Sequence, residues 1–169
     1  MKNFFLSTIM LLVFSISCNT AQNSDISKEE NQVGIIKGDD FRSKAMIKFT
    51  DAYVNNNLNS VADLFTSDAK IMVNDADLTF SEMTAGFSSG HNYFENIRHE
   101  DRDAFTMHYK EGDIAGNVYT HYWYTWKATS KKTGEEISIR GYAWMKWRGD
   151  KVEATYNAFD PTLYNASLN

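Results

Sequence analysis

Residues 121–147, HYWYTWKATSKKTGEEISIRGYAWMKW, decide the fold class of this chain because they read as two long β-strands joined by a tight turn. The turn Lys131-Lys132-Thr133-Gly134 separates two runs rich in aromatic and β-branched side chains. Seven large aromatic side chains lie in this stretch, and they fall on both faces of such a hairpin. One apolar face is enough to form a core, so the second aromatic face indicates a further role.

The turns of the C-terminal half set a register for the predicted sheet. The first turn places Tyr124 opposite Gly141. A second turn, which ends at Lys151, places Ala143 opposite Tyr156. Because side chains alternate along a strand, this register defines an inner face that meets the helices and an outer face that does not.

The inner face is predicted to be the more apolar of the two and to form a pocket. It mixes small residues, which leave volume, with tyrosines, which supply polar groups. This predicted inner face contains Phe105, Met107, Tyr109, Tyr122, Tyr124, Trp126, Ile139, Gly141, Ala143, Met145, Trp147, Val152, Ala154, Tyr156, Ala158 and Asp160. The predicted outer face contains Thr106, His108, Lys110, Tyr119, His121, Trp123, Thr125, Ser138, Arg140, Tyr142, Trp144, Lys146, Glu153, Thr155, Asn157 and Phe159.

Helices are expected before the strands. Apolar residues recur at helical spacing over 40–56, with Asp39 or Asp40 as the N-cap, and residues 60–68 favour a short second helix. A short strand, AKIMVN, follows. The capping-box sequence from Thr79 to Glu82 then opens a helical region that extends to about residue 97. Helices followed by an antiparallel meander predict an α+β domain with its helices on one face of the sheet.

Three stretches of the chain resemble the nuclear transport factor 2-like superfamily, also called SnoaL-like or ketosteroid isomerase-like. They are NNNLNSVADLFTSDAKIMVND at 55–75, the hairpin closed by Lys-Thr-Gly-Glu at 132–135, and the ending TYNAFDP at 155–161. The resemblance implies a cone-shaped domain over about residues 40–165, with a pocket between the helices and a curved antiparallel sheet. It also implies frequent dimerisation, but no single reaction.

The N-terminal residues are similar to a bacterial lipoprotein signal. A short apolar segment follows Lys2 and ends at the chain's only cysteine, Cys18. We therefore expect residues 1–17 to be a signal peptide, Cys18 to be lipidated, and residues 18–38 to be a flexible tether to a domain at 39–169. This organisation predicts a lipid-anchored membrane protein of the bacterial cell envelope that faces the periplasm or the cell surface.

The predicted pocket supplies the candidate ligand-binding residues Tyr53, Tyr109, Tyr122, Tyr124, Trp126 and Tyr156. Asp160, at the rim of an apolar cavity, is expected to have a raised pKa and to serve as a general base. Tyr156 is the candidate hydrogen-bond donor to a developing oxyanion.

The outer face predicts a homodimer interface. Trp123, Tyr142, Trp144 and Phe159 would form an exposed apolar patch there. His108 and His121 are also predicted to share this face. His99 is interpreted as part of a solvated helix end, within the charged run IRHEDRD.

Composition and motifs narrow the function classes. A formal net charge of −5 without a basic stripe argues against a nucleic-acid partner. The sequence has no metal-ligand motif, nucleophile motif or phosphate-binding glycine loop, so we predict no cofactor and no metal. Three functions stay open: binding of a small apolar or aromatic ligand, an isomerase, dehydratase or cyclase that uses Asp160 and a tyrosine, and a dimeric interaction module without a ligand.

Overall fold

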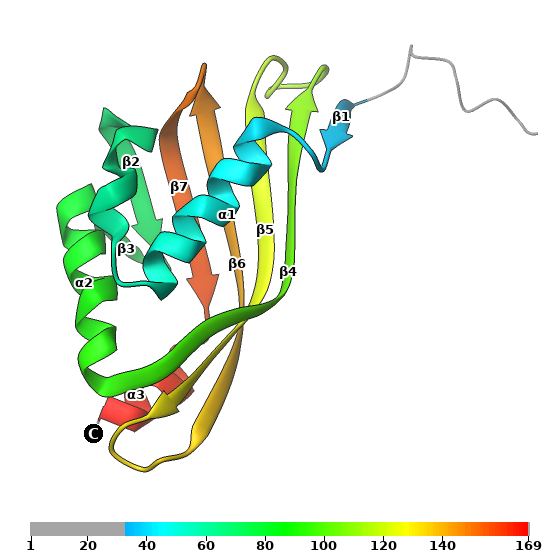
Figure 1. Cartoon of the computed structure of the whole chain (residues 1–169). Helices are drawn as coiled ribbons and strands as arrows, with labels where there is room; N and C mark the ends of the chain where they lie inside the picture. The colour runs from blue at the N-terminus through cyan, green and yellow to red at the C-terminus, as the bar shows by residue number, and fades with distance from the viewer. Residues whose placement is uncertain (1–32, 169) are drawn as a thin grey trace, which may run out of the picture. The chain divides into compact units, whose positions relative to one another are not determined.

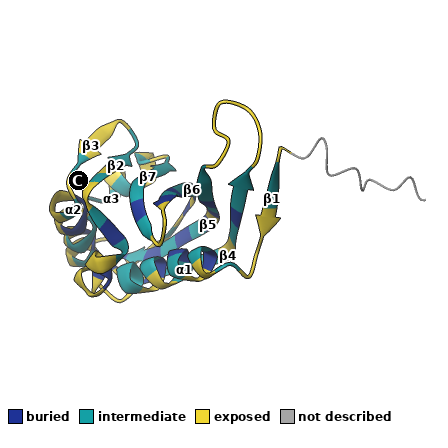
Figure 2. Ribbon diagram, turned by 90° about the horizontal axis from the view of Figure 1, so that it is seen from above, coloured by how far each residue is buried: buried dark blue, intermediate teal, exposed yellow. Residues whose placement is uncertain are grey.

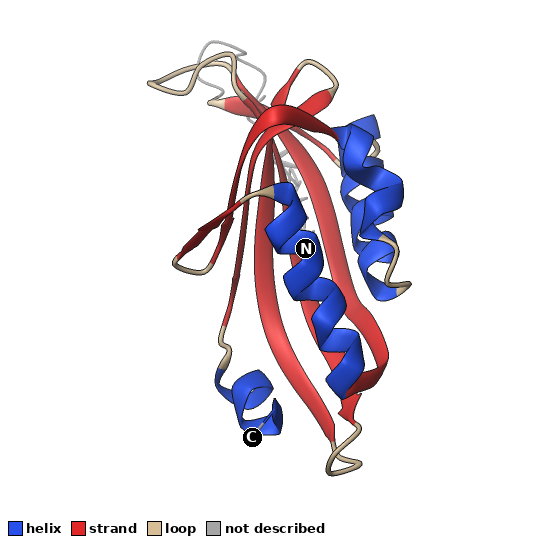
Figure 3. Ribbon diagram, turned by 90° about the vertical axis from the view of Figure 1, so that its left-hand side faces the viewer, coloured by secondary structure: helices blue, strands red, loops and turns tan. Residues whose placement is uncertain are grey.

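The computed structural model describes residues 33–168, which form an α+β domain with a curved seven-stranded sheet. The longer helices α1 and α2 lie on one side of the sheet, and the strands curve around them (Figures 1 and 3). Buried residues concentrate where α1 lies over the strands (Figure 2). The expected signal peptide, Cys18 and most of the expected tether lie outside the described residues.

The elements have the following bounds in chain order: β1 Gly34–Lys37, α1 Phe41–Val54, the 3₁₀ helix η2 Leu58–Leu64, β2 Phe65–Val73, β3 Ala76–Leu78, α2 Phe80–Tyr93, β4 Phe94–Tyr109, β5 Val118–Ser130, β6 Glu136–Arg148, β7 Lys151–Phe159 and α3 Thr162–Leu168. The strand order across the sheet is β1-β4-β5-β6-β7-β2-β3. All neighbouring strands are antiparallel except β2 and β7, which are parallel. Within residues 33–168, no helix has the length and apolar character needed to span a membrane.

Local sequence signals set the starts of both long helices as predicted. Asp40 caps α1, where its carboxylate accepts from the Arg42 backbone N–H at 2.9 Å. Thr79 and Glu82 form a full capping box at the start of α2. The α2 helix ends at Tyr93, four residues before the expected end, because the chain enters the long strand β4 at that point.

The expected tether extended to residue 38, but residues 34–37 instead form β1, which pairs with the end of β4. The backbone groups of this segment therefore find hydrogen-bond partners at the sheet edge. The predicted second helix is the 3₁₀ helix η2, and neither β3 nor α3 was anticipated from the sequence.

The β5–β6 register is as predicted, with Tyr124 opposite Gly141. The β6–β7 register is not, because Ala143 pairs with Asn157 rather than with Tyr156. A β-bulge causes the difference. Trp147 still pairs with Val152, but Lys146 pairs with Ala154, which leaves Glu153 as an extra residue in β7. Beyond the bulge the two faces of β7 exchange.

Strand β4 also presents the opposite faces from those predicted. Thr106 and His108 lie on the inner face, under α1, whereas Phe105, Met107 and Tyr109 lie on the outer face. The prediction placed the polar residues outside because their burial needs partners. The partners of these two side chains come from α1, from its N-cap and from β5, and the sequence of a single strand does not reveal them.

A chain of hydrogen bonds supplies partners to the buried hydroxyl groups. The indole Nε1 of Trp147 donates to Thr120 Oγ1 at 2.9 Å. A second hydrogen bond of 2.9 Å joins Thr120 Oγ1 to Thr106 Oγ1. Thr106 is bonded to Ser43 of α1 at 2.9 Å, and Ser43 donates to the Lys37 carbonyl at 3.3 Å. An indole only donates and a carbonyl only accepts, so the direction of the whole chain is fixed. It ties α1 to the centre of the sheet.

The Asp40 cap generates a stability prediction. Its carboxylate, 8% exposed, also accepts from His108 Nε2 at 3.0 Å. We expect Asp40→Ala to lower the free energy of unfolding by about 1–2 kcal/mol in urea titrations. The exposed neighbour Asp39 provides the control. Asp39→Ala should change the free energy of unfolding by less than about 0.5 kcal/mol.

The pH dependence of Asp40→Ala tests whether the ionised Asp40 carboxylate is the source of this stabilisation. Burial acts to raise the pKa of Asp40, but hydrogen bonds from Arg42 and His108 and the Arg42 charge outweigh it and hold the pKa below its usual value. The stabilisation is therefore present above the unfolded pKa, about 3.9, and is lost as pH falls through the folded pKa. Equal stability of Asp40→Ala and wild type at pH 7 would contradict this account.

Candidate ligand-binding site

A cavity of about 290 Å³ lies between the helices and the inner face of the sheet. Its helical walls carry Met46, Phe49, Thr50 and Tyr53 from α1, and Met83 and Phe87 from α2. The sheet contributes His99, Tyr122, Tyr124, Trp126, Ile139, Ala143, Met145, Thr155, Asn157 and Phe159, and α3 contributes Tyr164. The wall is therefore mostly apolar, with a few polar groups among aromatic rings.

Four of the six candidate ligand-binding residues, Tyr53, Tyr122, Tyr124 and Trp126, line this cavity. Trp126 Nε1 donates to Tyr53 Oη at 2.8 Å, which joins the end of α1 to the sheet. Burial raises the pKa of Tyr53 and of Tyr124. Both phenols therefore stay protonated and can act only as neutral hydrogen-bonding groups. Their contact with a ligand stays a prediction.

Gly141 gives Tyr124 its place in the wall. A Cβ at Gly141 would overlap the Tyr124 ring, so only glycine lets the ring lie across β6 at this point. The Tyr124 hydroxyl then donates to Asn157 Oδ1 at 2.7 Å. The exchange of faces in β7 is what brings Asn157 to the cavity.

His99 is the main site residue that the sequence interpretation missed. It lies on β4, between two bulges where Asn96 and Asp101 adopt positive φ values of 53° and 48°. Its ring stacks on Tyr124, with 4.4 Å between centroids and 5° between planes. Its Nδ1 lies 2.9 Å from Tyr122 Oη, while its Nε2 is buried without a hydrogen-bond partner. The earlier interpretation of His99 as a solvated helix end is wrong.

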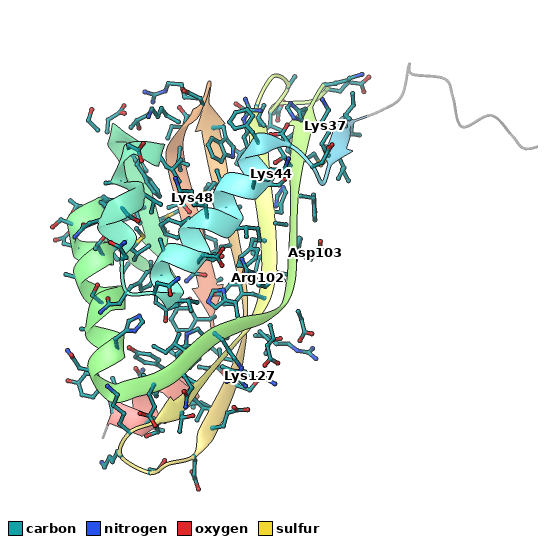
Figure 4. All side chains as sticks on the ribbon, in the orientation of Figure 1. Lys37, Lys44, Lys48, Arg102, Asp103 and Lys127 are labelled. Carbon is teal, nitrogen blue, oxygen red and sulfur yellow. The ribbon has the colours of Figure 1, made fainter. Side chains whose placement is uncertain are left out.

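The surroundings of His99 keep its ring uncharged. Burial, with a smaller contribution from the positive charge of Arg102, lowers the pKa of His99 to about 3. Arg102 lies on β4 close to α1 (Figure 4), where it donates to Asp51 at 2.9 Å and to Thr50 at 3.3 Å. An imidazole of such low basicity is a weak proton acceptor, and it cannot form an ion pair at neutral pH.

Two candidate residues lie away from the cavity, which corrects their predicted position. Tyr156 lies on the outer face, with its ring 6.1 Å from that of Trp144. Tyr109 also lies there and packs against Tyr119 at 5.8 Å. The bulge at Glu153 turns Tyr156 to the outer face. Tyr109 lies on the outer face because the two faces of β4 are exchanged relative to the prediction.

Asp160 does not have the properties of a general base. The chain turns after β7, and the exposed Asp160 carboxylate accepts from the backbone N–H of Thr162 at 2.9 Å, at the start of α3. Hydrogen bonds from Thr162 lower the pKa of Asp160, whereas a raised pKa was expected. The predicted role depended on burial, and the local turn keeps this carboxylate in water.

The residues predicted for the outer face divide between the two faces of the sheet. Trp123, Tyr142 and Trp144 lie on it as predicted, and Trp123 is 46% exposed. Phe159 was predicted beside them but lines the cavity instead, because the β7 bulge turns it inward. His108 and His121 lie on opposite faces: His108 donates to Asp40, and His121 is bonded to Tyr142 at 2.7 Å.

The cavity wall lacks an acid–base pair. Glu82 is the single acidic residue that the described part of the chain gives to this wall, and its Oε2 accepts from both the backbone N–H and the hydroxyl of Thr79 at 2.8 Å. No Lys or Arg of residues 33–168 lines the cavity. In the described part of the chain, no three His, Cys, Asp or Glu side chains gather in a way that could hold a metal ion.

Solved structures with this fold confirm the predicted fold class. AclR of Streptomyces galilaeus, a proposed hydroxylase, is similar with a TM-score of 0.57 and 16% identity, over 75% of this chain and 95% of its own. IdmH of Streptomyces antibioticus, a proposed polyketide cyclase, gives a TM-score of 0.54 and 15% identity, over 75% and 96%.

A protein from Catenulispora acidiphila, described as ketosteroid isomerase-like in fold and solved in complex with trimethylamine, gives a TM-score of 0.51 and 16% identity, over 68% of this chain and 84% of its own. No protein-family model and no curated protein sequence matches this chain. At such identities the likeness establishes the nuclear transport factor 2-like fold alone.

The His99 environment generates a pH prediction. Its folded pKa of about 3 lies below the ordinary value of 6.5, so the stability it contributes is fully present above pH 6.5 and is lost as pH falls toward 3. The slope is at most about 1.4 kcal/mol per pH unit. In urea titrations at pH 7 and pH 5, wild type should lose about 1–2 kcal/mol more than His99→Gln. Identical losses in the two proteins would show that His99 titrates normally.

Proposed function

We propose that this domain binds a small apolar or aromatic molecule in the cavity between α1, α2 and the sheet. The observation that carries the proposal is the cavity itself, about 290 Å³ with a mostly apolar wall. Small-molecule sites begin at about this volume, and voids larger than a water molecule are few in protein interiors.

Binding is favoured over catalysis by the charges at the site. The Asp160 carboxylate faces water, the Glu82 carboxylate is held by Thr79, and the His99 ring is a weak base. General acid–base chemistry needs a group whose pKa lies near the working pH. The cavity wall offers none, whereas neutral hydrogen-bonding groups suit ligand recognition.

Cavity filling tests the proposed function. We expect toluene at ten times its Kd to raise the Tm of the purified protein by roughly 3–6 °C, because a ligand that binds only the native state stabilises it by about 1.4 kcal/mol at that concentration. Ala143 lines the cavity, so Ala143→Phe should abolish the rise. Ala158 pairs with Tyr142 on the outer face, so Ala158→Phe adds the same volume elsewhere and should keep it. A wild-type Tm unmoved by toluene would contradict the proposal.

We also propose that Cys18 anchors the domain to a membrane of the bacterial cell envelope. The support is in the sequence: the sole cysteine follows a short apolar segment that begins after Lys2. Cells fed an alkyne analogue of palmitate should label the wild-type protein, and Cys18→Ser should lose the label and leave the membrane fraction. Labelling that persists in Cys18→Ser would exclude this residue as the anchor.

A homodimer through the outer face is the third part of the proposal. Ring contacts join Phe105, Trp123 and Tyr142 across three strands, with 5.7 Å and 4.6 Å between centroids, and Trp123 stays largely exposed. Exposed aromatic clusters favour protein interfaces. Light scattering should give twice the monomer mass for wild type and the monomer mass for Trp123→Asp. A monomeric wild type at micromolar concentration would contradict this part.

A further inference from the structure

The amide group of Asn157 is a polar group of the cavity that one hydrogen bond orients and whose donors are unused. Asn157 pairs with Ala143, whose small side chain leaves space beside it. The Tyr124 hydroxyl donates to Oδ1, so the two N–H groups of Nδ2 point away from that bond. Nδ2 makes no hydrogen bond to any described residue, and it is not among the buried polar atoms that lack a partner. It therefore remains accessible as a donor.

Tyr124 is the positioning residue for this amide. An asparagine side chain can turn either its oxygen or its nitrogen toward a neighbour, and only a partner decides between them. The Tyr124 phenol stays protonated because burial raises its pKa, and its O–H donates to Asn157 Oδ1, which leaves Nδ2 on the other side of the amide. Gly141 on the next strand leaves the space that the Tyr124 ring occupies. The donor direction of Asn157 is thus set by three neighbouring strands.

The charges around the cavity restrict what this donor can meet. Among the described residues, no Lys or Arg lines the wall, so a buried carboxylate or phosphate would have no counter-ion there. Glu82, the one acidic wall residue among residues 33–168, is exposed, and its Oε2 accepts two hydrogen bonds from Thr79, so water screens its charge from an ammonium ion inside the cavity. An uncharged oxygen acceptor can accept a hydrogen bond from Nδ2 without burying an unpaired anion or cation.

We propose that the cavity takes an uncharged, mostly apolar carbonyl compound, whose oxygen accepts from Asn157 Nδ2 while its apolar part lies against the side chains of α1 and α2. This ligand class rests on the binding function proposed above and adds to it a recognition residue. Ketones, esters and amides all present such an oxygen. A hydrocarbon of the same shape fills the same volume but leaves the Asn157 donors without a partner.

Four single-ring probes test the ligand class by titration calorimetry on the full-length protein in detergent. Acetophenone carries the carbonyl, ethylbenzene has nearly the same shape without it, benzoate is the anion, and phenyltrimethylammonium is the cation. One net hydrogen bond corresponds to a factor of roughly 2–12 in affinity. We expect acetophenone to bind about fivefold more tightly than ethylbenzene, and both ions to bind more weakly than either.

Two variants assign the preference to Asn157. Asn157→Leu removes the donors at similar volume, and Asn157→Asp removes them while it keeps an acceptor for the Tyr124 hydroxyl. Both should bind acetophenone and ethylbenzene with equal affinity. Asn165→Leu, an exposed substitution on α3, is the control and should keep the fivefold preference.

The outcomes separate this proposal from the binding function. Equal affinity of acetophenone and ethylbenzene for wild type would overturn the carbonyl proposal and leave the binding function standing. A preference that survives in both Asn157 variants would overturn the role of Asn157. If phenyltrimethylammonium binds most tightly, the carbonyl proposal is wrong and the ligand class is instead a cation that contacts the faces of the aromatic rings. If none of the four probes binds, both the ligand class and the binding function fail.

Discussion

The site depends on one extra residue in β7. Glu153 is the bulged residue, and its carboxylate accepts from Lys146 Nζ and from Arg148 Nε, each at 2.8 Å. Those two cations lie two residues apart on β6, on the same face, and the Glu153 carboxylate bridges them at the bulge. Without the bulge, Tyr156 would face the helices. With it, Asn157 and Phe159 do, and the cavity gains its amide and loses a phenol.

Strand β4 shows the same principle at two further bulges. Asn96 and Asp101 adopt left-handed backbone conformations, and their side chains are tied to β5 through Thr129 at 3.3 Å and Thr125 at 2.9 Å. The two bends flank His99 and bring its ring onto Tyr124. The cavity wall is therefore set by irregularities in the sheet, at positions where a regular strand would have aimed other side chains inward.

Features that depend on neighbouring residues in the sequence could be predicted. They include the Asp40 cap, the Thr79–Glu82 capping box and the β5–β6 register, because a tight turn fixes the pairing on both sides. The inward positions of Tyr122, Tyr124 and Trp126 follow from that register. The bulges could not be predicted, since they depend on contacts between strands. His99 was missed for the same reason. It lies in a charged run, which is typical of solvated surface, and only the fold shows that its ring packs against Tyr124.

The position of the Asn157 side chain can be tested most directly by nuclear Overhauser effects between β5 and β7, in protein with labelled asparagine and tyrosine. The account predicts contacts between the Asn157 side-chain amide and the Tyr124 ring, and none between the Tyr156 and Tyr124 rings. Contacts between the two tyrosine rings, with none from the Asn157 amide, would mean that β7 runs without the Glu153 bulge. The arrangement of the cavity described above would then be wrong.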